Sequence, residues 1–115
     1  MRPERIALKY RLWDRLGCEA RAFEKDRGME PHICQDGKTL HEVILRRLPQ
    51  QHKHYRDHEL NCSPMCQSSH MRYQHDSEYR RWFIKRRSKI YGRQAIVDYL
   101  AESPLKMPPK LEEFE

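Results

Sequence analysis

The stretch that decides the predicted fold is Leu40-His41-Glu42-Val43-Ile44 together with Asn61-Cys62-Ser63-Pro64-Met65-Cys66-Gln67-Ser68-Ser69-His70. In the first segment an imidazole and a carboxylate stand side by side in an apolar run, which predicts a strand. In the second segment Ser63 followed by Pro64 is typical of a helix N-cap and first helical position. We therefore expect a strand carrying His41 and Glu42 to face a helix carrying His70.

The segments around this stretch predict a short hairpin and a polar loop. Asp36-Gly37 favours a tight turn, and it lies between Ile33-Cys34 and Thr39-Leu40. We expect a hairpin there, with its second strand running on through Ile44 or Leu45. Residues 50–59 contain no aliphatic side chain and are predicted to form a solvated loop.

Helices are predicted on both sides of this core. Apolar residues recur at three- and four-residue steps over 4–27, which predicts one helix that ends at Gly28. Asp76-Ser77 offers a second cap, for a helix ending at Gly92, and a shorter helix is predicted at about 93–102. The expected fold class is α+β, divided into an N-terminal helix (1–28), a core (29–75), C-terminal basic helices (76–103) and an extended tail (104–115).

Composition indicates a small basic domain. Of the 115 residues only 37% are hydrophobic, so the core must be thin, and one domain is more plausible than two. Lys and Arg number 23 against 17 Asp and Glu, a formal charge of +6. This balance suits a polyanionic partner, and nucleic acid before any other.

Nothing in the sequence predicts a membrane span or a signal peptide. No apolar run approaches eighteen residues, and the N-terminus is charged and amphipathic. We therefore expect a reducing, cytoplasmic location. There the four cysteines at positions 18, 34, 62 and 66 are expected to be thiols or metal ligands instead of disulfides.

The ordered set His41, Asn61 and His70 resembles the HNH endonucleases, whose fold is the ββα-metal finger. Members of that family often read Asn-Leu-Val-Pro-Leu-Cys-x-x-Cys-His, and residues 61–70 match its Asn, first Cys and His in register. Leu40–Val43 is similar to the family's Val-His-His-Ile or Val-Asp-His-Ile, and it resembles small phage-encoded members with His-Glu at this place. The resemblance covers 33–74, roughly a third of the chain.

The resemblance implies a metal-dependent DNA endonuclease that hydrolyses phosphodiesters by nicking or by double-strand cutting, with low sequence preference. It implies one divalent ion (Mg²⁺, Mn²⁺, Ni²⁺ or Zn²⁺) and double-stranded DNA as the substrate. It also implies the cytoplasm of a host cell as the location, if the protein is phage-encoded, and partners in phage packaging or recombination. The alternatives are a catalytically inactive nucleic-acid-binding module and a phage accessory protein of similar fold.

The resemblance also implies roles for individual residues. In strict register His41 is a metal ligand and Glu42 is the general base, whereas a slip of one residue would make His41 the base. Asn61 corresponds to the asparagine whose amide ties the loop together and orients the strand. His70 corresponds to the helix metal ligand, and Gln74, a weak ligand, takes the place of a second one.

The cysteines depart from the family pattern. Many HNH domains hold a structural zinc with two Cys-x-x-Cys pairs, but Gly37 and Ser69 stand where the second cysteine of each pair would be. A makeshift zinc site could draw on Cys34, Cys62 and Cys66, with His32 as a further candidate ligand. Apolar thiols in the core are the favoured interpretation, so a structural zinc is not expected.

DNA affinity is expected to come mainly from phosphate contacts. The candidate residues are basic and lie beside the predicted strand, in the polar loop or on the helix after the finger. They are Arg46, Arg47, Lys53, Arg56, Arg72, Arg80, Arg81 and Lys85, with Arg86 and Lys89 farther along that helix. Arg87 is predicted to belong to the same basic helix face.

Overall fold

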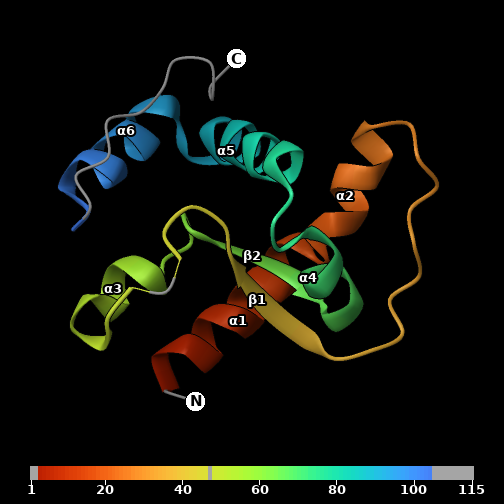
Figure 1. The fold of residues 1–115 in the computed structure, drawn as a ribbon, viewed down its shortest axis with the longest axis horizontal. Helices are drawn as coiled ribbons and strands as arrows, with labels where there is room; N and C mark the ends of the chain where they lie inside the picture. The colour runs from red at the N-terminus through yellow and green to blue at the C-terminus, as the bar shows by residue number, and fades with distance from the viewer. Residues whose placement is uncertain (1–2, 47, 105–115) are drawn as a thin grey trace.

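The computed structural model describes residues 3–46 and 48–104. Arg47 and most of the predicted tail, residues 105–115, lie outside the described residues. The structure is mainly helical with a two-stranded antiparallel sheet, which confirms the α+β class (Figure 1). The elements are α1 (Pro3–Leu16), α2 (Glu19–Asp26), β1 (Lys38–Glu42), η1 (Gln50–His52), α3 (Lys53–Arg56), β2 (Cys62–Cys66), α4 (Gln67–Tyr73), α5 (Ser77–Tyr91) and α6 (Arg93–Glu102).

The sheet pairs β1 directly with β2. Its register places His41 opposite Ser63 and Leu40 opposite Pro64. The amide of Val43 donates to the carbonyl of Asn61 over 2.8 Å, so the cross-strand hydrogen bonds of β2 fall on its odd-numbered residues. Pro64 therefore has its nitrogen on the side away from β1 and costs the ladder no hydrogen bond. The prediction that Ser63-Pro64 starts a helix was wrong, because both residues lie in β2 and α4 begins at Gln67.

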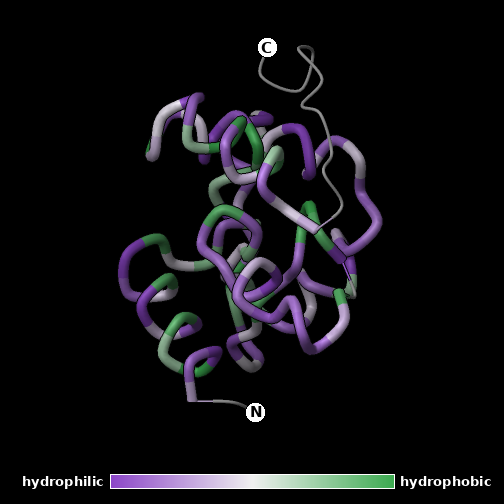
Figure 2. The backbone as a smooth tube through the Cα atoms, turned by 90° about the vertical axis from the view of Figure 1, so that its left-hand side faces the viewer, coloured by the Kyte–Doolittle hydropathy of each residue, from purple (hydrophilic) through white to green (hydrophobic). Residues whose placement is uncertain are grey.

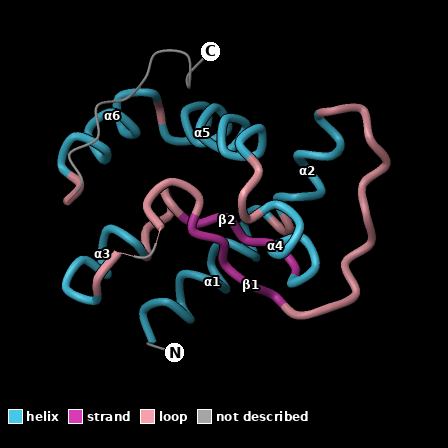
Figure 3. The backbone as a smooth tube through the Cα atoms, viewed as in Figure 1, coloured by secondary structure: helices cyan, strands magenta, loops and turns pink. Residues whose placement is uncertain are grey.

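The predicted hairpin at Asp36-Gly37 was also wrong. Residues 29–37 form a long loop without helix or strand, seen between α2 and β1 in Figure 3. The carboxylate of Asp36 accepts hydrogen bonds from the amide (3.1 Å) and the hydroxyl of Ser68, in the first turn of α4. Asp36 thus caps a helix that is distant in sequence, and this tertiary contact replaces the expected local turn. The strand after the loop ends at Glu42, before Ile44 and Leu45.

The N-terminal segment forms two helices where one was predicted. Gly17 has a φ of +66°, and Cys18 is extended with φ −74° and ψ 107°, so the helix stops and restarts between Leu16 and Glu19. A positive φ strains any residue with a Cβ atom, which explains glycine at position 17. The predicted stop at Gly28 is confirmed by its φ of +75° after α2.

The C-terminal helices agree with the prediction except on one face. The carboxylate of Asp76 accepts from the amides of Glu78 (2.8 Å) and Tyr79 (3.0 Å), which confirms the cap. Arg87, expected on the basic face, is fully buried. The loop predicted at 50–59 instead contains η1 and α3.

Helices cover the sheet on both sides, as Figure 1 shows. Leu40 packs with Leu8, Leu12 and Cys62 in a small cluster between α1 and the sheet. A larger cluster includes Phe23 and joins α2, β2, α5 and α6. Figure 2 shows hydrophobic stretches scattered among hydrophilic ones, as expected for a thin core. In the described part of the chain, no helix combines the length and apolar character that crossing a bilayer requires.

Candidate metal centres and nucleic-acid interface

Two histidines far apart in sequence meet at the surface of the sheet. His41, from β1, and His70, from α4, have ring centroids 5.1 Å apart and ring planes inclined by 47°. His41 is only 4% exposed, and His70 is half-buried. They share a pocket of about 170 Å³ lined by Arg5, Leu40, His41, Glu42, Arg46, His70, Gln74 and His75. The structure therefore brings together the strand and helix histidines that the sequence singled out.

Burial favours the neutral form of both imidazoles. Burial lowers the pKa of His41 to about 3, and the charges of His70 and Arg46 add to this effect. Burial also lowers the pKa of His70, with further contributions from Arg5 and Arg46. A neutral imidazole has a free nitrogen lone pair and can ligate a metal ion. Within the described residues neither ring has a hydrogen-bonding partner.

The other predicted base and ligand, Glu42 and Gln74, are less favourably placed than the two histidines. Glu42 lines the pocket, but its carboxylate is ion-paired with Arg56 (3.2 Å) and Arg5 (3.9 Å). Gln74 lines the same pocket. In the described segments, no third ligand atom from His, Cys, Asp or Glu joins the His41–His70 pair within 4.8 Å.

Asn61 ties the loop after β1 together through its side-chain amide. It is fully buried, and its side-chain oxygen accepts from the amides of Ile44 (2.9 Å) and Leu45 (2.6 Å). Its side-chain nitrogen donates to the carbonyls of Leu45 (3.0 Å) and Arg56 (2.9 Å). These four hydrogen bonds fix the chain that leaves β1 and so hold His41 in place.

Cationic side chains flank the histidine pocket on both sides. On one side lies a pocket of about 190 Å³ whose lining includes Arg46 and Arg80 together with His41 and His75. On the other side lies a pocket of about 240 Å³ whose lining includes His70 and three cations, Arg5, Lys9 and Lys38. Sequence reasoning missed these three, although Arg5 and Lys9 stand four residues apart, on one face of α1.

The other basic candidates are dispersed. Arg56 donates to the carbonyl of Leu48 (3.1 Å) besides pairing with Glu42, so it serves the fold. Lys53 and Arg72 are exposed on α3 and α4. Arg81 and Lys85 line a different pocket, beside Trp82. Arg47 lies outside the described residues.

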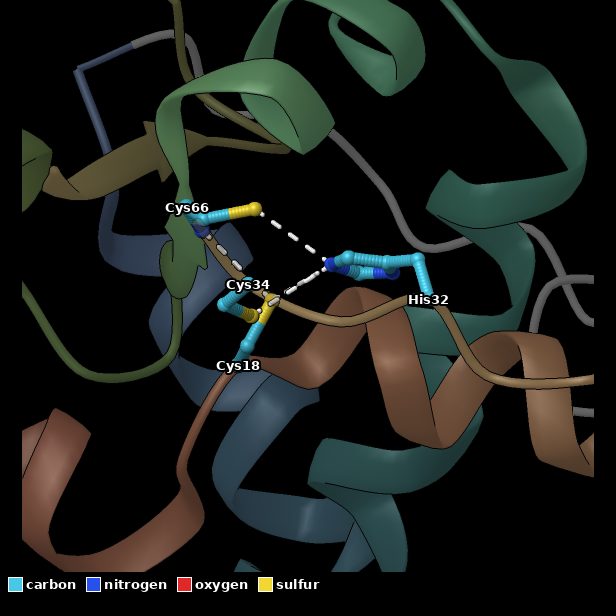
Figure 4. Close-up of side chains that lie close together, drawn as sticks. All are labelled: Cys18, His32, Cys34 and Cys66. Carbon is cyan, nitrogen blue, oxygen red and sulfur yellow. Dashed lines mark hydrogen bonds between the residues drawn. The ribbon is translucent and has the colours of Figure 1, made fainter. Parts of the chain in front are cut away.

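A second group of ligands assembles near the start of α4. Cys18, His32, Cys34 and Cys66 each place a ligand atom within 4.8 Å of all the others, and such a group could hold a metal ion. Figure 4 shows the ring of His32 directed toward the three sulfur atoms. Cys62, named in the makeshift site above, does not belong to the group, and its thiol donates to the carbonyl of Arg56 over 3.2 Å. Sequence reasoning missed Cys18, which has no neighbouring cysteine to form a motif.

Hydrogen bonds surround this Cys/His group. Burial lowers the pKa of His32, but the bonds to Glu24 and Cys66 outweigh this and leave it raised. Burial raises the pKa of the Cys66 thiol, whereas hydrogen bonds from Ser69 and His32 together lower it below its ordinary value. These hydrogen bonds make Cys66 more acidic than an ordinary thiol, whereas burial and the neighbouring thiols raise the pKa of Cys34 in the same group to about 12.

The chain was compared with protein-family models, with curated proteins and with solved structures, and none of the three comparisons found a match.

Proposed function

We propose that the protein is a metal-dependent DNA endonuclease of the HNH type that hydrolyses phosphodiesters with low sequence preference. The observation that carries this proposal is the His41–His70 pair. Two buried or half-buried imidazoles face each other without hydrogen-bonding partners among the described residues. Their sequence order around Asn61 is that of the HNH pattern.

The spacing of the two rings fits a shared divalent ion. Two imidazoles that bind one tetrahedral ion through nitrogens at about 2.0–2.1 Å place their centroids about 5 Å apart. The observed separation is 5.1 Å. A bound ion would supply positive charge to the scissile phosphate and would activate a water molecule. His41 and His70 would hold that ion, with Gln74 at the side of the pocket.

The position of His41 favours one of the two candidates for the general base, His41 and Glu42. Because the rings of His41 and His70 lie close enough to share an ion, the register that makes His41 a ligand and Glu42 the base is the better supported one. Glu42 lines the same pocket, and its carboxylate is held by the ion pairs with Arg5 and Arg56. Replacing Glu42 by Gln removes a base but preserves size, so it separates this role from metal binding.

Bound DNA would lie along the cationic side chains in the pockets that adjoin the histidine pair. The three pockets adjoin, since His70 and Arg5 belong to the first two and His41 and Arg46 link the first and third. Phosphates on either side of a scissile bond could then contact Lys9 and Lys38 on one flank and Arg80 on the other. Affinity from such contacts falls steeply with salt concentration.

The test is a plasmid-relaxation assay across Mg²⁺, Mn²⁺, Ni²⁺ and Zn²⁺, with and without chelator. We expect metal-dependent nicking that falls by about 100-fold or more in His41→Ala and in His70→Ala. His54→Ala is the matched control, because His54 is an exposed histidine on α3. Unchanged cutting in His41→Ala, or cutting that persists in chelator, would contradict the proposal.

A non-catalytic DNA-binding module is the second candidate. It is favoured by the lack of a third strong ligand among the residues that the structure describes, since Gln74 stands where the family often has a stronger one. This candidate predicts salt-dependent DNA binding by the wild type with no metal-stimulated cleavage. Binding that is weakened in Lys9→Ala and Lys38→Ala while no metal supports nicking would select it.

A further inference from the structure

Three separate segments of the chain converge on the Cys/His group. Cys18 comes from the junction of α1 and α2, His32 and Cys34 come from the long loop, and Cys66 ends β2. Cys66 is 34 residues from His32 in sequence. Three sulfurs and one imidazole are the Cys₃His donor set of a closed, four-coordinate zinc site.

The distances within the group fit one tetrahedral ion. With Zn–S at about 2.3 Å and Zn–N at about 2.0–2.1 Å, sulfur and nitrogen ligands lie about 3.5 Å apart. The Nε2 atom of His32 lies 3.3 Å from the sulfur of Cys66, 3.4 Å from that of Cys34 and 3.8 Å from that of Cys18. The ligand atoms therefore surround a space of the right size, with the histidine nitrogen directed at it.

His32 is held in the orientation that ligation requires. Its Nδ1 atom lies 2.7 Å from the Glu24 carboxylate, and its backbone amide donates to the same oxygen over 3.0 Å. The hydroxyl of Tyr73 donates to the other carboxylate oxygen over 2.6 Å. A carboxylate that accepts from Nδ1 leaves Nε2 unprotonated, with its lone pair directed at the three sulfurs and at the hydroxyl of Ser69, 3.1 Å away, as in metal sites where a carboxylate orients a ligating histidine.

The sulfur atoms also receive hydrogen bonds. The backbone amide of Cys66 donates to the sulfur of Cys18 over 3.5 Å. The hydroxyl of Ser69 lies 3.2 Å from the sulfur of Cys66. Donors of this kind stabilise thiolates.

We propose that Cys18, His32, Cys34 and Cys66 bind one structural zinc ion, which fastens the α1–α2 junction and the long loop to the end of β2. The set is not a pair of Cys-x-x-Cys motifs. Ser69 occupies one expected cysteine position, and Cys18 lies outside the finger segment. The ion explains how residues 29–37 keep one path without regular secondary structure, and it makes zinc part of the stability of the fold. This proposal does not depend on nuclease activity.

The experiment measures bound metal after purification and dialysis against a weak chelator, by mass spectrometry of the intact protein and by elemental analysis. We expect about one tightly held zinc per wild-type chain. Cys34→Ser should reduce zinc affinity by at least about 100-fold, since losing a ligand costs more than losing a residue that orients one. Cys34 is exposed, so this change removes little packing.

Two matched variants isolate the site. Cys62→Ser makes the same chemical change at a buried cysteine outside the group, and a serine hydroxyl can still donate to the carbonyl of Arg56. It should retain the zinc. The double variant His41→Ala/His70→Ala should also retain it, which separates this ion from any bound at the histidine pair.

Cobalt gives a second readout that requires no variant to fold. Titration of metal-free wild-type protein with Co²⁺ should produce thiolate-to-cobalt charge-transfer absorption and the visible bands of a tetrahedral site. Chelation should lower the melting temperature of the wild type by at least about 5 °C. Absence of retained zinc together with an octahedral cobalt spectrum would overturn the proposal, as would full zinc retention by Cys34→Ser.

Discussion

At the scale of single residues, some candidate site residues could be identified from their order in the sequence and others could not. His41, Asn61 and His70 follow a fixed order, and the structure gathers two of them in one pocket while the third ties down the adjoining loop. Cys18 follows no such order, because its partners lie 14 or more residues away along the chain and only the folded loop brings them near. Sequence reasoning finds ligands that belong to a motif and misses ligands recruited by tertiary structure.

His58 gives the protein an acid-sensitive contact outside both candidate metal sites. Its Nδ1 atom accepts from the amide of Leu60 over 3.0 Å. Burial lowers the pKa of His58 from its ordinary value of 6.5; Glu59 opposes this shift and Arg11 adds to it. Below about pH 6.5 the unfolded chain therefore binds a proton that the folded chain does not. This contribution to stability is complete above that pH and is lost as the pH falls.

We expect His58→Asn to flatten the acid side of the stability profile, because an asparagine oxygen can accept from the same amide without titrating. Urea unfolding at several values between about pH 5 and pH 7 measures this. His54→Asn, at an exposed position, should follow the wild-type profile. If the two variants gave the same slope, His58 would make no contribution to the acid sensitivity.

At the scale of secondary structure elements, predictions succeeded where the signal was local. Asp76 caps α5 through its own neighbours, so its role could be read from a few residues. Asp36-Gly37 and Ser63-Pro64 carry equally familiar local signals, but long-range contacts override them. The carboxylate of Asp36 accepts a hydrogen bond from the amide of Ser68, and Pro64 lies opposite Leu40 in the sheet. The two strands that pair, β1 and β2, are consequently separated in sequence by residues 43–61.

The break between α1 and α2 depends on the backbone of one glycine. Replacing Gly17 by Ala places a Cβ atom where no heavy atom lies within 4 Å, so the cost comes from the φ of +66° alone. We expect Gly17→Ala to lower the free energy of unfolding by about 1–2 kcal/mol. Gly37→Ala, equally uncrowded but without a positive φ, should leave stability unchanged or raise it by up to about 1 kcal/mol. Equal losses in the two variants, measured by urea unfolding, would disprove the backbone explanation.

At the scale of the whole molecule, a buried ion pair joins segments from opposite ends of the chain. Both terminal nitrogens of the Arg87 guanidinium group donate to Glu19, over 2.7 Å and 2.6 Å, and both side chains are fully buried. Arg87 also donates to the carbonyls of Glu59 (2.8 Å) and Cys62 (3.0 Å). The sequence placed Arg87 on a basic surface because helical spacing alone does not show which face a distant carboxylate will cover.

Removing one partner of this pair should cost more than removing both. Arg87→Met leaves the Glu19 carboxylate with less compensation and should lower the free energy of unfolding by about 3 kcal/mol or more. Adding Glu19→Gln to that variant should recover part of the loss. Arg27→Met, which breaks the exposed pair with Glu78, should change stability by less than about 1 kcal/mol. Chemical unfolding of the wild type and these three variants checks this order, and a double variant no more stable than Arg87→Met would refute it.

The outward side of β2 offers no hydrogen-bond donor to a visiting strand. The amide of Cys62 is engaged by the carbonyl of His58, that of Cys66 by the sulfur of Cys18, and Pro64 between them has none. The Cys62 carbonyl is likewise engaged by Arg87. An extended peptide or a second copy of the chain therefore cannot lengthen this sheet at β2, and the small protein avoids edge-to-edge aggregation there without a covering strand.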